Sequence, residues 1–479
     1  MFGVVVNKRV GSHRMADPGL TYKEAVKFLD SFTNYERTPK PQSMRRIKLE
    51  RMRRLCALLG DPQRSFRSVL VAGTNAKGSI CAMLYALLQG TPMRIGLYTS
   101  PHLDNLRERI RVWPQPAQTE GASPFTDWIS EEAFAKTATR VQEAAAVLRR
   151  GGPAKDAPTY FELLTAIAFV HFQQSGVDLA VLEVGLGGRL DATNVVDAGI
   201  SVIGPLALDH TSVLGSDVLS IAKEKAGIIK PGQRVISAAQ SDDADAVLKI
   251  SSEAYGSPVF RYGRDFNADI LSHTLEGLTL NVQGMRGTYR NLSLPLLGRH
   301  QAENAAVAIA ALECLADAGT PHSLIEQGLS RVAWPGRIEV VSDSPLVLLD
   351  GAHNPQAAQA LANTLRELLP ARKIHVLIGM SSDKDSEAVA QILGPLATSV
   401  TCTSSRNPRA LDAAVLANRF RPYASDIHVI ADPADASTCV LNAMEPADVL
   451  LVTGSFFLVG AMRNSFTHAR TRRQALAVS

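Results

Sequence analysis

Residues 71–79 constrain the fold of this chain more than any other part of its sequence. A short apolar stretch is followed by a glycine-bearing turn with one lysine, and then by Ser79 at the start of a predicted helix. Backbone N–H groups in such a turn, together with the positive end of a helix, bind phosphate. Lys77 can add a full charge, and the Ser79 hydroxyl can ligate magnesium. The segment therefore predicts a strand–loop–helix unit that binds ATP or GTP. Its lysine, Lys77, precedes Gly78, whereas in the standard G-x-x-x-x-G-K-[ST] pattern the lysine follows the glycine.

The bulk properties limit the class of protein. A length of 479 residues suits two or three domains, and 46% hydrophobic with 20% charged residues is typical of a globular enzyme. A net charge of +4 does not argue for a nucleic-acid partner. The five cysteines are scattered without a C-x-x-C pair, which favours a reducing compartment, the cytoplasm, over a disulfide or zinc framework.

No membrane partner or secretion signal is expected. The chain has no run of about 18 apolar residues, and residues 1–20 lack an apolar core of signal-peptide length. Met15 is an alternative start of translation.

Strands and helices alternate over most of the chain, which indicates an α/β fold with a mostly parallel sheet. In the first part, strands are predicted at 68–72, 94–99, 178–184 and 200–206, and helices at 22–31, 44–59, 79–89, 131–150, 160–174 and 301–318. Residues 258–294 alternate in short segments and predict a β-rich appendage, and residues 113–128 predict a loop without an assigned role.

Alternation restarts after a break at 333–338, so we expect domains at 1–334 and 335–479. The second domain is predicted to have strands at 346–349, 374–378, 400–403, 427–430 and 449–452, with helices at 356–369, 385–394, 411–419 and 434–444.

Chemically active side chains follow several predicted strands. Glu183 ends a buried strand, where ligands of open α/β sheets bind and where a carboxylate suits Mg²⁺; a surface salt bridge is the alternative. His210 follows the next strand and could ligate a metal, although a lone histidine is more often structural. The spacing around Lys225 alone favours a solvated helix face. Arg337, at the domain boundary, could reach a phosphate when the domains close, or form an ordinary hinge salt bridge.

Taken in order, these segments resemble the Mur ligase superfamily and, within it, the folylpolyglutamate synthase and dihydrofolate synthase family. The resemblance spans residues 21–463. Residues 73–79 are similar to the family's GTNGKGS, with Ala76 in place of a glycine, and 99–103 are similar to its TSPHL loop. Further matches lie at 183–194, 208–215, 224–230, 300–304, 334–337, 350–355, 383–385 and 454–455.

The resemblance implies a P-loop ATP-binding domain with a β-rich appendage, followed by a smaller Rossmann-like α/β ligase domain. It also implies an ATP-dependent ligase that phosphorylates a carboxylate of a pterin-bearing substrate and lets the amine of L-glutamate attack the acyl phosphate. The protein then mainly positions reactants and neutralises charge. The implied substrates are ATP, L-glutamate and either dihydropteroate or tetrahydrofolate. The implied cofactors are two Mg²⁺ ions and a carbamylated lysine. We expect the protein to be a monomer.

The resemblance also assigns roles to residues. The ATP-binding residues would be Gly73, Thr74, Asn75, Ala76, Lys77, Gly78, Ser79, Asn304, Arg337 and Asp350. Metal ligands would be Ser79, Glu183, His210 and carbamylated Lys225. The catalytic set would be Lys77, Lys225, His210, Arg337 and His353. The substrate side would comprise Ser100, His102, Arg109, Asp191, Thr193 and Ser455.

Three alternatives and one backbone prediction remain. The chain could have one of the two folate activities only, act as a Mur-type ligase on a UDP-linked precursor, or be a regulatory nucleotide-binding module. The Ser100–His102 loop and the lack of a separate UDP-binding domain disfavour the second, and the combined set Glu183, His210, Lys225 and Arg337 disfavours the third. Because alanine disfavours a positive φ, we expect a negative φ at Ala76.

Overall fold

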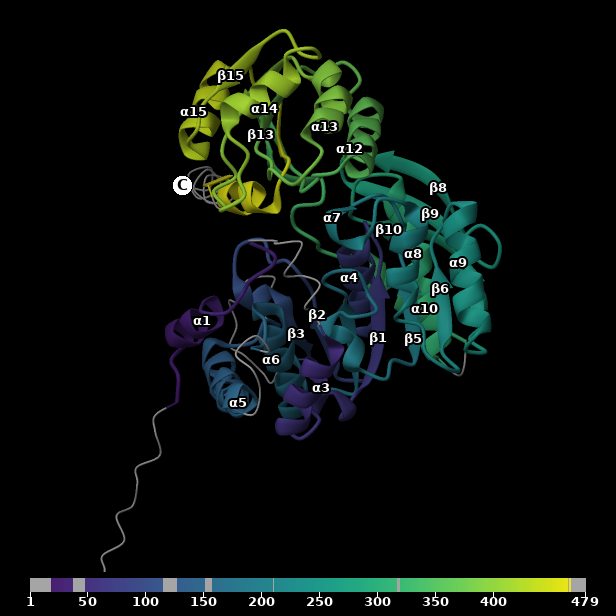
Figure 1. Cartoon of the computed structure of the whole chain (residues 1–479). Coiled ribbons are helices and arrows are strands. Elements are labelled where there is room, and N and C mark those ends of the chain that lie inside the picture. The colour runs from purple at the N-terminus through teal and green to yellow at the C-terminus, as the bar shows by residue number, and fades with distance from the viewer. Residues whose placement is uncertain are drawn as a thin grey trace, which may run out of the picture.

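The computed structural model describes residues 19–37, 48–114, 127–150, 157–209, 211–316, 319–463 and 465–466. Figure 1 shows two α/β bodies, each built around its own sheet. The predicted fold class, two α/β units with mostly parallel sheets, is therefore confirmed. Most of the predicted loop 113–128 lies outside the described residues. Among the described helices, none combines the length and apolar character that a membrane span requires.

The first sheet has the order β3-β2-β4-β1-β5-β6-β7. Only the edge strand β3 runs antiparallel to its neighbour. The central strands are buried along nearly their whole length because helices cover both faces, which explains their continuous apolar sequences. Its strands are β1 (Arg67–Ala72), β2 (Ile95–Tyr98), β3 (Ile110–Trp113), β4 (Leu179–Glu183), β5 (Ile200–Ile203), β6 (Arg234–Ser237) and β7 (Val259–Arg261).

Several helices of this domain begin at residues whose side chains cap the first turn. Thr21 and Thr159 each form a capping box with a glutamate three residues later. The helix after the phosphate loop is apolar on all sides because it lies between the sheet and an alanine-rich helix. The helices are α1 (Tyr22–Asp30), α3 (Leu49–Leu58), α4 (Lys77–Leu88), α5 (Glu131–Arg150), α6 (Tyr160–Gln174), α7 (Thr211–Leu214), α8 (Val218–Ala226), α9 (Asp242–Glu253), α10 (His300–Leu315) and α11 (His322–Ser330).

The predicted β-rich appendage is a three-stranded antiparallel sheet of β8 (Asn267–Thr274), β9 (Gly277–Gln283) and β10 (Thr288–Leu294). The start of the predicted segment differs, because β7 pairs with β6 and belongs to the main sheet. The buried side chains of this small sheet pack on α10.

The second sheet has the order β11-β12-β16-β13-β14-β15. The predicted strands all form within one residue of the expected bounds, and the sequence missed only the antiparallel edge strand β11 (Glu339–Asp343). The other strands are β12 (Leu346–Leu349), β13 (Ile374–Ile378), β14 (Ser399–Cys402), β15 (Ile427–Val429) and β16 (Val449–Thr453). The helices are α12 (Pro355–Leu368), α13 (Ser386–Leu393), α14 (Ala413–Phe420) and α15 (Pro433–Ala443).

The carboxyl ends of strands from both sheets supply the residues that meet between the domains. Residues after β1 and β5 contact residues after β12 and β13 through hydrogen bonds and an ion pair. Figure 1 shows the second domain seated over this edge of the first. Carboxyl ends of parallel strands are where α/β proteins bind ligands, so the fold places the candidate site at this junction.

The backbone prediction for Ala76 is wrong. Ala76 has φ 65° and ψ −12°, a left-handed conformation, and it is the residue before α4. The loop must turn within a few residues from the buried strand β1 into the buried helix α4, and both ends are held by packing. Tertiary packing therefore imposes the conformation that the local preference of alanine disfavours.

Replacing Ala76 with glycine is expected to stabilise the protein by about 0.5–1 kcal/mol, because glycine adopts a positive φ without steric cost. The free energy of unfolding in urea measures this effect. The matched control is Ala360→Gly in the interior of α12, which we expect to destabilise by about 1 kcal/mol. Destabilisation by Ala76→Gly would contradict the strained loop.

Candidate active site between the two domains

The phosphate loop presents the first turn of α4 to the junction. The Lys77 ammonium donates to the carbonyl oxygens of Gly73, at 3.0 Å, and Thr74, at 3.2 Å. Gly78 is required by packing, because a Cβ there would lie 2.9 Å from the ring of Trp334. A cationic side chain thus lies at the N-terminal end of a helix, an arrangement that favours phosphate binding.

Glu183 fits the role of a magnesium ligand. It is 4% exposed, and its Oε2 accepts a hydrogen bond of 3.0 Å from the Ser100 N–H. Burial raises the pKa of this carboxyl, while the nearby Lys77 charge opposes the shift. The buried Ser79 hydroxyl belongs to the first turn of α4, which follows β1, the direct neighbour of β4. A buried carboxylate and a hydroxyl are hard oxygen donors that suit Mg²⁺.

Lys225 is not the solvated side chain that its spacing alone favoured. It is 4% exposed, and its ammonium donates to the Gly73 carbonyl oxygen at 2.8 Å. Burial, together with the charge of Lys77, lowers its pKa to about 7. The Gly73 carbonyl oxygen therefore accepts hydrogen bonds from the ammonium groups of both Lys77 and Lys225, and Lys225 lies directly against the phosphate loop.

Asp209 links the two domains. Its carboxylate accepts from the Lys384 ammonium at 2.7 Å and from the Asn354 amide at 3.4 Å, and it lies 3.8 Å from the His353 Nε2. The same Asn354 amide donates to the Asn75 Oδ1 of the phosphate loop at 3.0 Å. His210, predicted as a metal ligand beside Asp209, lies outside the described residues.

Arg337 lies at the start of the second domain and faces the first. Its guanidinium stacks over the Phe456 ring, with 4.2 Å between the guanidinium carbon and the ring centroid. Burial lowers its pKa, while the carboxylates of Asp350 and Glu183 oppose that shift. The charge of Arg337 therefore interacts electrostatically with a carboxylate of each domain, Glu183 of the first and Asp350 of the second. Asp350 itself accepts from the Ile338 and Ala352 N–H groups, at 2.9 and 2.8 Å.

The remaining predicted residues of the nucleotide and glutamate side are also placed. His353 lies beside Phe456 and hydrogen-bonds the Gly351 carbonyl oxygen through Nδ1 at 2.8 Å. Ser455 accepts from the Phe457 N–H at the start of the helical residues 456–463. Asn304 is buried in α10 and donates to Gln301 at 2.9 Å.

The predicted substrate-side residues divide into two groups. Ser100 and His102 lie on the loop after β2, which the Glu183 carboxylate anchors. Asp191 accepts from Thr193 at 2.6 Å and from the Leu186 N–H at 2.9 Å, and burial raises its pKa. Because the Thr193 side chain is fully buried, this structure gives it a role in holding the loop and no direct contact with a substrate.

Sequence reasoning missed several residues of the junction. Asp209 and Lys384 could have been found from the sequence, since both lie in segments that match motifs of the family. Glu36 and Arg409 had none, because they lie far apart in the chain and meet only after folding, where Arg409 donates to the Glu36 carbonyl oxygen. Phe456 is found only through its stacking with Arg337.

The junction also depends on close backbone packing. A Cβ at Gly460 would lie 1.9 Å from the Leu103 carbonyl oxygen of the other domain. We expect Gly460→Ala to lower the free energy of unfolding by about 1–3 kcal/mol and to lower activity, because the domains must separate to fit one methyl group. Urea unfolding and turnover measure both effects. Gly199→Ala is the control, because a Cβ at Gly199 meets open space; equal behaviour of the two variants would contradict the tight junction.

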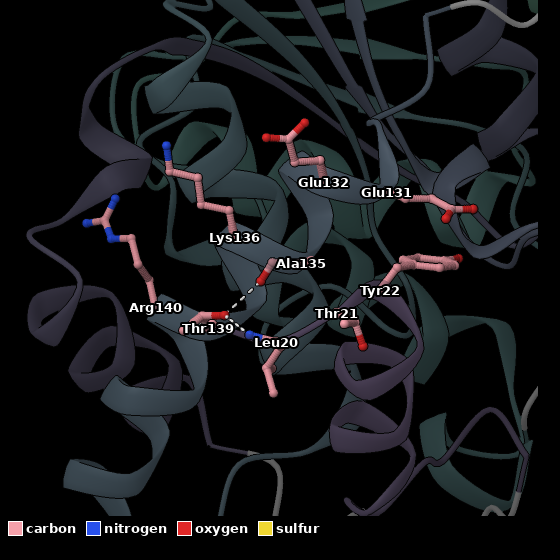
Figure 2. Close-up of a pocket in the computed structure, with 10 residues that line it drawn as sticks. Leu20, Thr21, Tyr22, Glu131, Glu132, Ala135, Lys136, Thr139 and Arg140 are labelled. Atoms are coloured by element: carbon pink, nitrogen blue, oxygen red, sulfur yellow. Dashed lines mark hydrogen bonds between the residues drawn. The ribbon is translucent and has the colours of Figure 1, made fainter. Parts of the chain in front are cut away.

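A hollow on the surface lies elsewhere. Figure 2 shows it between the start of α1 and the exposed side of α5, where the Leu20 N–H donates to the Thr139 hydroxyl at 2.9 Å. Its volume is about 590 Å³, and its lining residues include no predicted site residue. The candidate site is therefore the domain junction and not this hollow.

Comparison with known proteins assigns the class. The model of the Mur ligase middle domain matches residues 124–312, and that of the Mur ligase glutamate ligase domain matches residues 336–456. The dihydrofolate synthase/folylpolyglutamate synthase of Mycobacterium tuberculosis is 36% identical over 443 residues, which cover 87% of this chain and 90% of that protein.

Solved structures agree. Mycobacterium tuberculosis folylpolyglutamate synthase complexed with ADP and AMPPCP has a TM-score of 0.83 and 33% identity, covering 93% of this chain and 98% of that one. Escherichia coli FolC in complex with DHPP and ADP has a TM-score of 0.81 and 30% identity, covering 94% and 98%. The fold and the matched domains are thus those of an ATP-dependent ligase of the Mur type. The chain belongs to the folylpolyglutamate synthase/dihydrofolate synthase family, which confirms the resemblance drawn from its motifs.

Proposed function

We propose that this enzyme uses ATP to join L-glutamate to the carboxylate of tetrahydrofolates and of dihydropteroate, through an acyl phosphate. The observation that carries the proposal is the junction itself. There, the phosphate loop and Glu183 of one domain lie opposite Arg337 and His353 of the other. A carboxylate is a poor electrophile, and phosphorylation supplies the leaving group that attack by an amine requires.

Each domain supplies part of this chemistry. Lys77 and the first turn of α4 would hold the ATP phosphates, and Arg337 would neutralise charge on the transferred phosphoryl group. His353 and Ser455, at the carboxyl edge of the second sheet, would face the glutamate and the acyl phosphate. Asn304 and Asp350 would contact the nucleotide, and Ser100 and His102 the folate.

We also propose that Ser79, Glu183, His210 and carbamylated Lys225 hold two Mg²⁺ ions, which would neutralise phosphate charge. The described residues contain no cluster of three His, Cys, Asp or Glu side chains that could hold a metal by themselves. A carbamate on Lys225 would add an anion at this place. The buried position of Lys225 and its pKa of about 7 support the modification, because only a neutral amine reacts with carbon dioxide.

Two further properties complete the proposal. One chain supplies both halves of the junction, which supports a monomer as the working unit. All five cysteines are free, and four of them are buried, which supports a reducing compartment such as the cytoplasm.

The test is phosphate release with ATP, Mg²⁺ and L-glutamate, with dihydropteroate and tetrahydrofolate supplied separately. We expect glutamate-dependent turnover with each and none after chelation of the metal. Turnover with dihydropteroate alone would remove the polyglutamylation activity. No glutamate-dependent turnover with either substrate would overturn the proposed function.

A further inference from the structure

An ion pair between the buried Arg109 and the partly exposed Glu36 contacts the loop after β2 at His102. Arg109 is the last residue of the helical turn η2 (Leu106–Arg109), immediately before β3, and is 2% exposed. Its two terminal nitrogens donate to the two carboxylate oxygens of Glu36, at 2.8 and 2.7 Å. A buried guanidinium needs such a bidentate partner to offset its desolvation. These contacts occupy both terminal nitrogens of Arg109 with Glu36.

The third nitrogen of Arg109 determines the state of His102. Arg109 Nε donates to His102 Nδ1 at 2.9 Å. A guanidinium only donates and stays charged, so Nδ1 must accept with its lone pair. The single proton of the neutral imidazole then lies on Nε2. A second proton is disfavoured, because burial and the charges of Arg109 and Arg37 lower the pKa of His102 to about 2.

The loop that carries His102 is held on both sides. The Ser100 N–H donates to Glu183, and the Leu103 N–H donates to Glu108 at 2.8 Å. Gly460 of the second domain approaches the Leu103 carbonyl. His102 is only partly buried, and its Nε2 makes no hydrogen bond with any residue that the structure describes. The imidazole therefore presents an N–H donor from the loop that Glu183 anchors through Ser100 and that Gly460 of the second domain approaches at Leu103.

We infer that Glu36 and Arg109 are positioning residues that hold His102 as a neutral imidazole, with its Nε2–H donated to an acceptor oxygen of the folate substrate. The inference rests on the proposed function and assigns Arg109 a place beneath the site in preference to contact with the substrate. A donor that stays neutral suits a substrate whose carboxylate must remain free to attack ATP, since a cationic imidazole would pair with that carboxylate.

The second domain contributes to this arrangement. Arg409 donates to the Glu36 carbonyl oxygen and pairs with Asp383 at 2.8 Å. The segment that carries Glu36 is thus held between Arg109 of its own domain and Arg409 of the other.

The first experiment observes the proton directly. In the full-length protein with ¹⁵N-labelled histidine, the His102 signals are assigned by their loss in His102→Gln. We expect a pyrrole-type Nε2 and a pyridine-type Nδ1 across the neutral pH range. Glu36→Gln, which loosens Arg109, is expected to return His102 to a mixture of tautomers. A pyrrole-type Nδ1 in the unmodified protein would overturn the inference.

The second experiment measures steady-state kinetics with each folate substrate. His102→Leu is expected to raise KM for the folate about tenfold with KM for ATP unchanged, as loss of one hydrogen bond predicts. His102→Gln keeps an N–H near Nε2 and should stay within about threefold of the unmodified enzyme. His428→Leu, at an exposed histidine, is the control. If the unmodified enzyme is active but His102→Leu leaves the folate KM unchanged, the inference fails while the proposed function stands.

Discussion

Replacing Lys225 with alanine is expected to lower kcat by about 100- to 1,000-fold, the usual cost of removing a group that stabilises charge in an enclosed site. Lys225 lies buried against the phosphate loop, where the ammonium contacts the Gly73 carbonyl and the carbamate proposed here would lie near Glu183 and Ser79. A short carboxylate such as acetate fits the space left by the side chain and can replace the missing anion. We therefore expect added acetate to restore part of the activity.

The matched control is Lys223→Ala, because Lys223 is an exposed lysine on the same helix. This variant is expected to keep full activity. Acetate should leave the unmodified enzyme and the control unchanged. Full activity of Lys225→Ala without acetate would refute the carbamate role, and a loss that no short carboxylate restores would reduce Lys225 to a support of the phosphate loop.

The pH dependence has a definite sign. The pKa of Lys225 is lowered to about 7, so the amine is largely protonated below that pH and neutral above it. Because only the neutral amine forms a carbamate, activity should fall as the pH drops through about 7 and recover as it rises. When dissolved carbon dioxide is removed from the buffer, the loss of activity at low pH should be larger than in its presence. With ¹³C-labelled bicarbonate, the unmodified enzyme should show a ¹³C carbamate signal that is missing from Lys225→Ala.

Replacing Arg337 with alanine is expected to lower kcat by about 1,000-fold, the lower range for an arginine that stabilises a phosphoryl-transfer transition state. The Phe456 ring stacks on the guanidinium, and the charges of the Glu183 and Asp350 carboxylates favour its protonated form. Arg337→Lys keeps the charge but loses the planar group that stacks on the ring, so an intermediate loss is expected.

The readouts separate catalysis from folding. Steady-state kinetics should show the loss in kcat with a smaller change in KM for ATP, and urea unfolding should show a stable protein. Arg331→Ala, at an exposed arginine shortly before the junction, is the control and should be fully active. An Arg337→Ala variant that keeps its kcat would limit Arg337 to a hinge contact.

The architecture was predictable because its signals are local. Continuous apolar stretches predicted the buried parallel strands, and the alternation of strands with helices predicted the two α/β units. The edge strand β11 was missed because it is short and only partly buried, so its sequence shows no continuous apolar run. The start of the appendage was misplaced because pairing of β7 with β6 depends on residues distant in the chain.

The site was only partly predictable. Motif order places Lys77, Glu183, Lys225 and Arg337 near one junction, since each follows or precedes an element at the same edge of a sheet. Spacing by itself predicted that Lys225 lies on a solvated helix face, whereas the structure buries it. The sequence also left Arg109 on the substrate side, whereas its contacts are with Glu36 and His102.

The sequence by itself determined the α/β alternation, the phosphate loop and the family, because these depend on patterns within one or two neighbouring elements. Only the tertiary structure decided the left-handed turn at Ala76, the burial of Lys225, the contact of His102 with Arg109 and the contacts of Asp209 with the second domain. Each of these arises where groups from distant parts of the chain share one low-dielectric junction. The balance of packing, charge and hydrogen bonding there overrides the preference of any single residue.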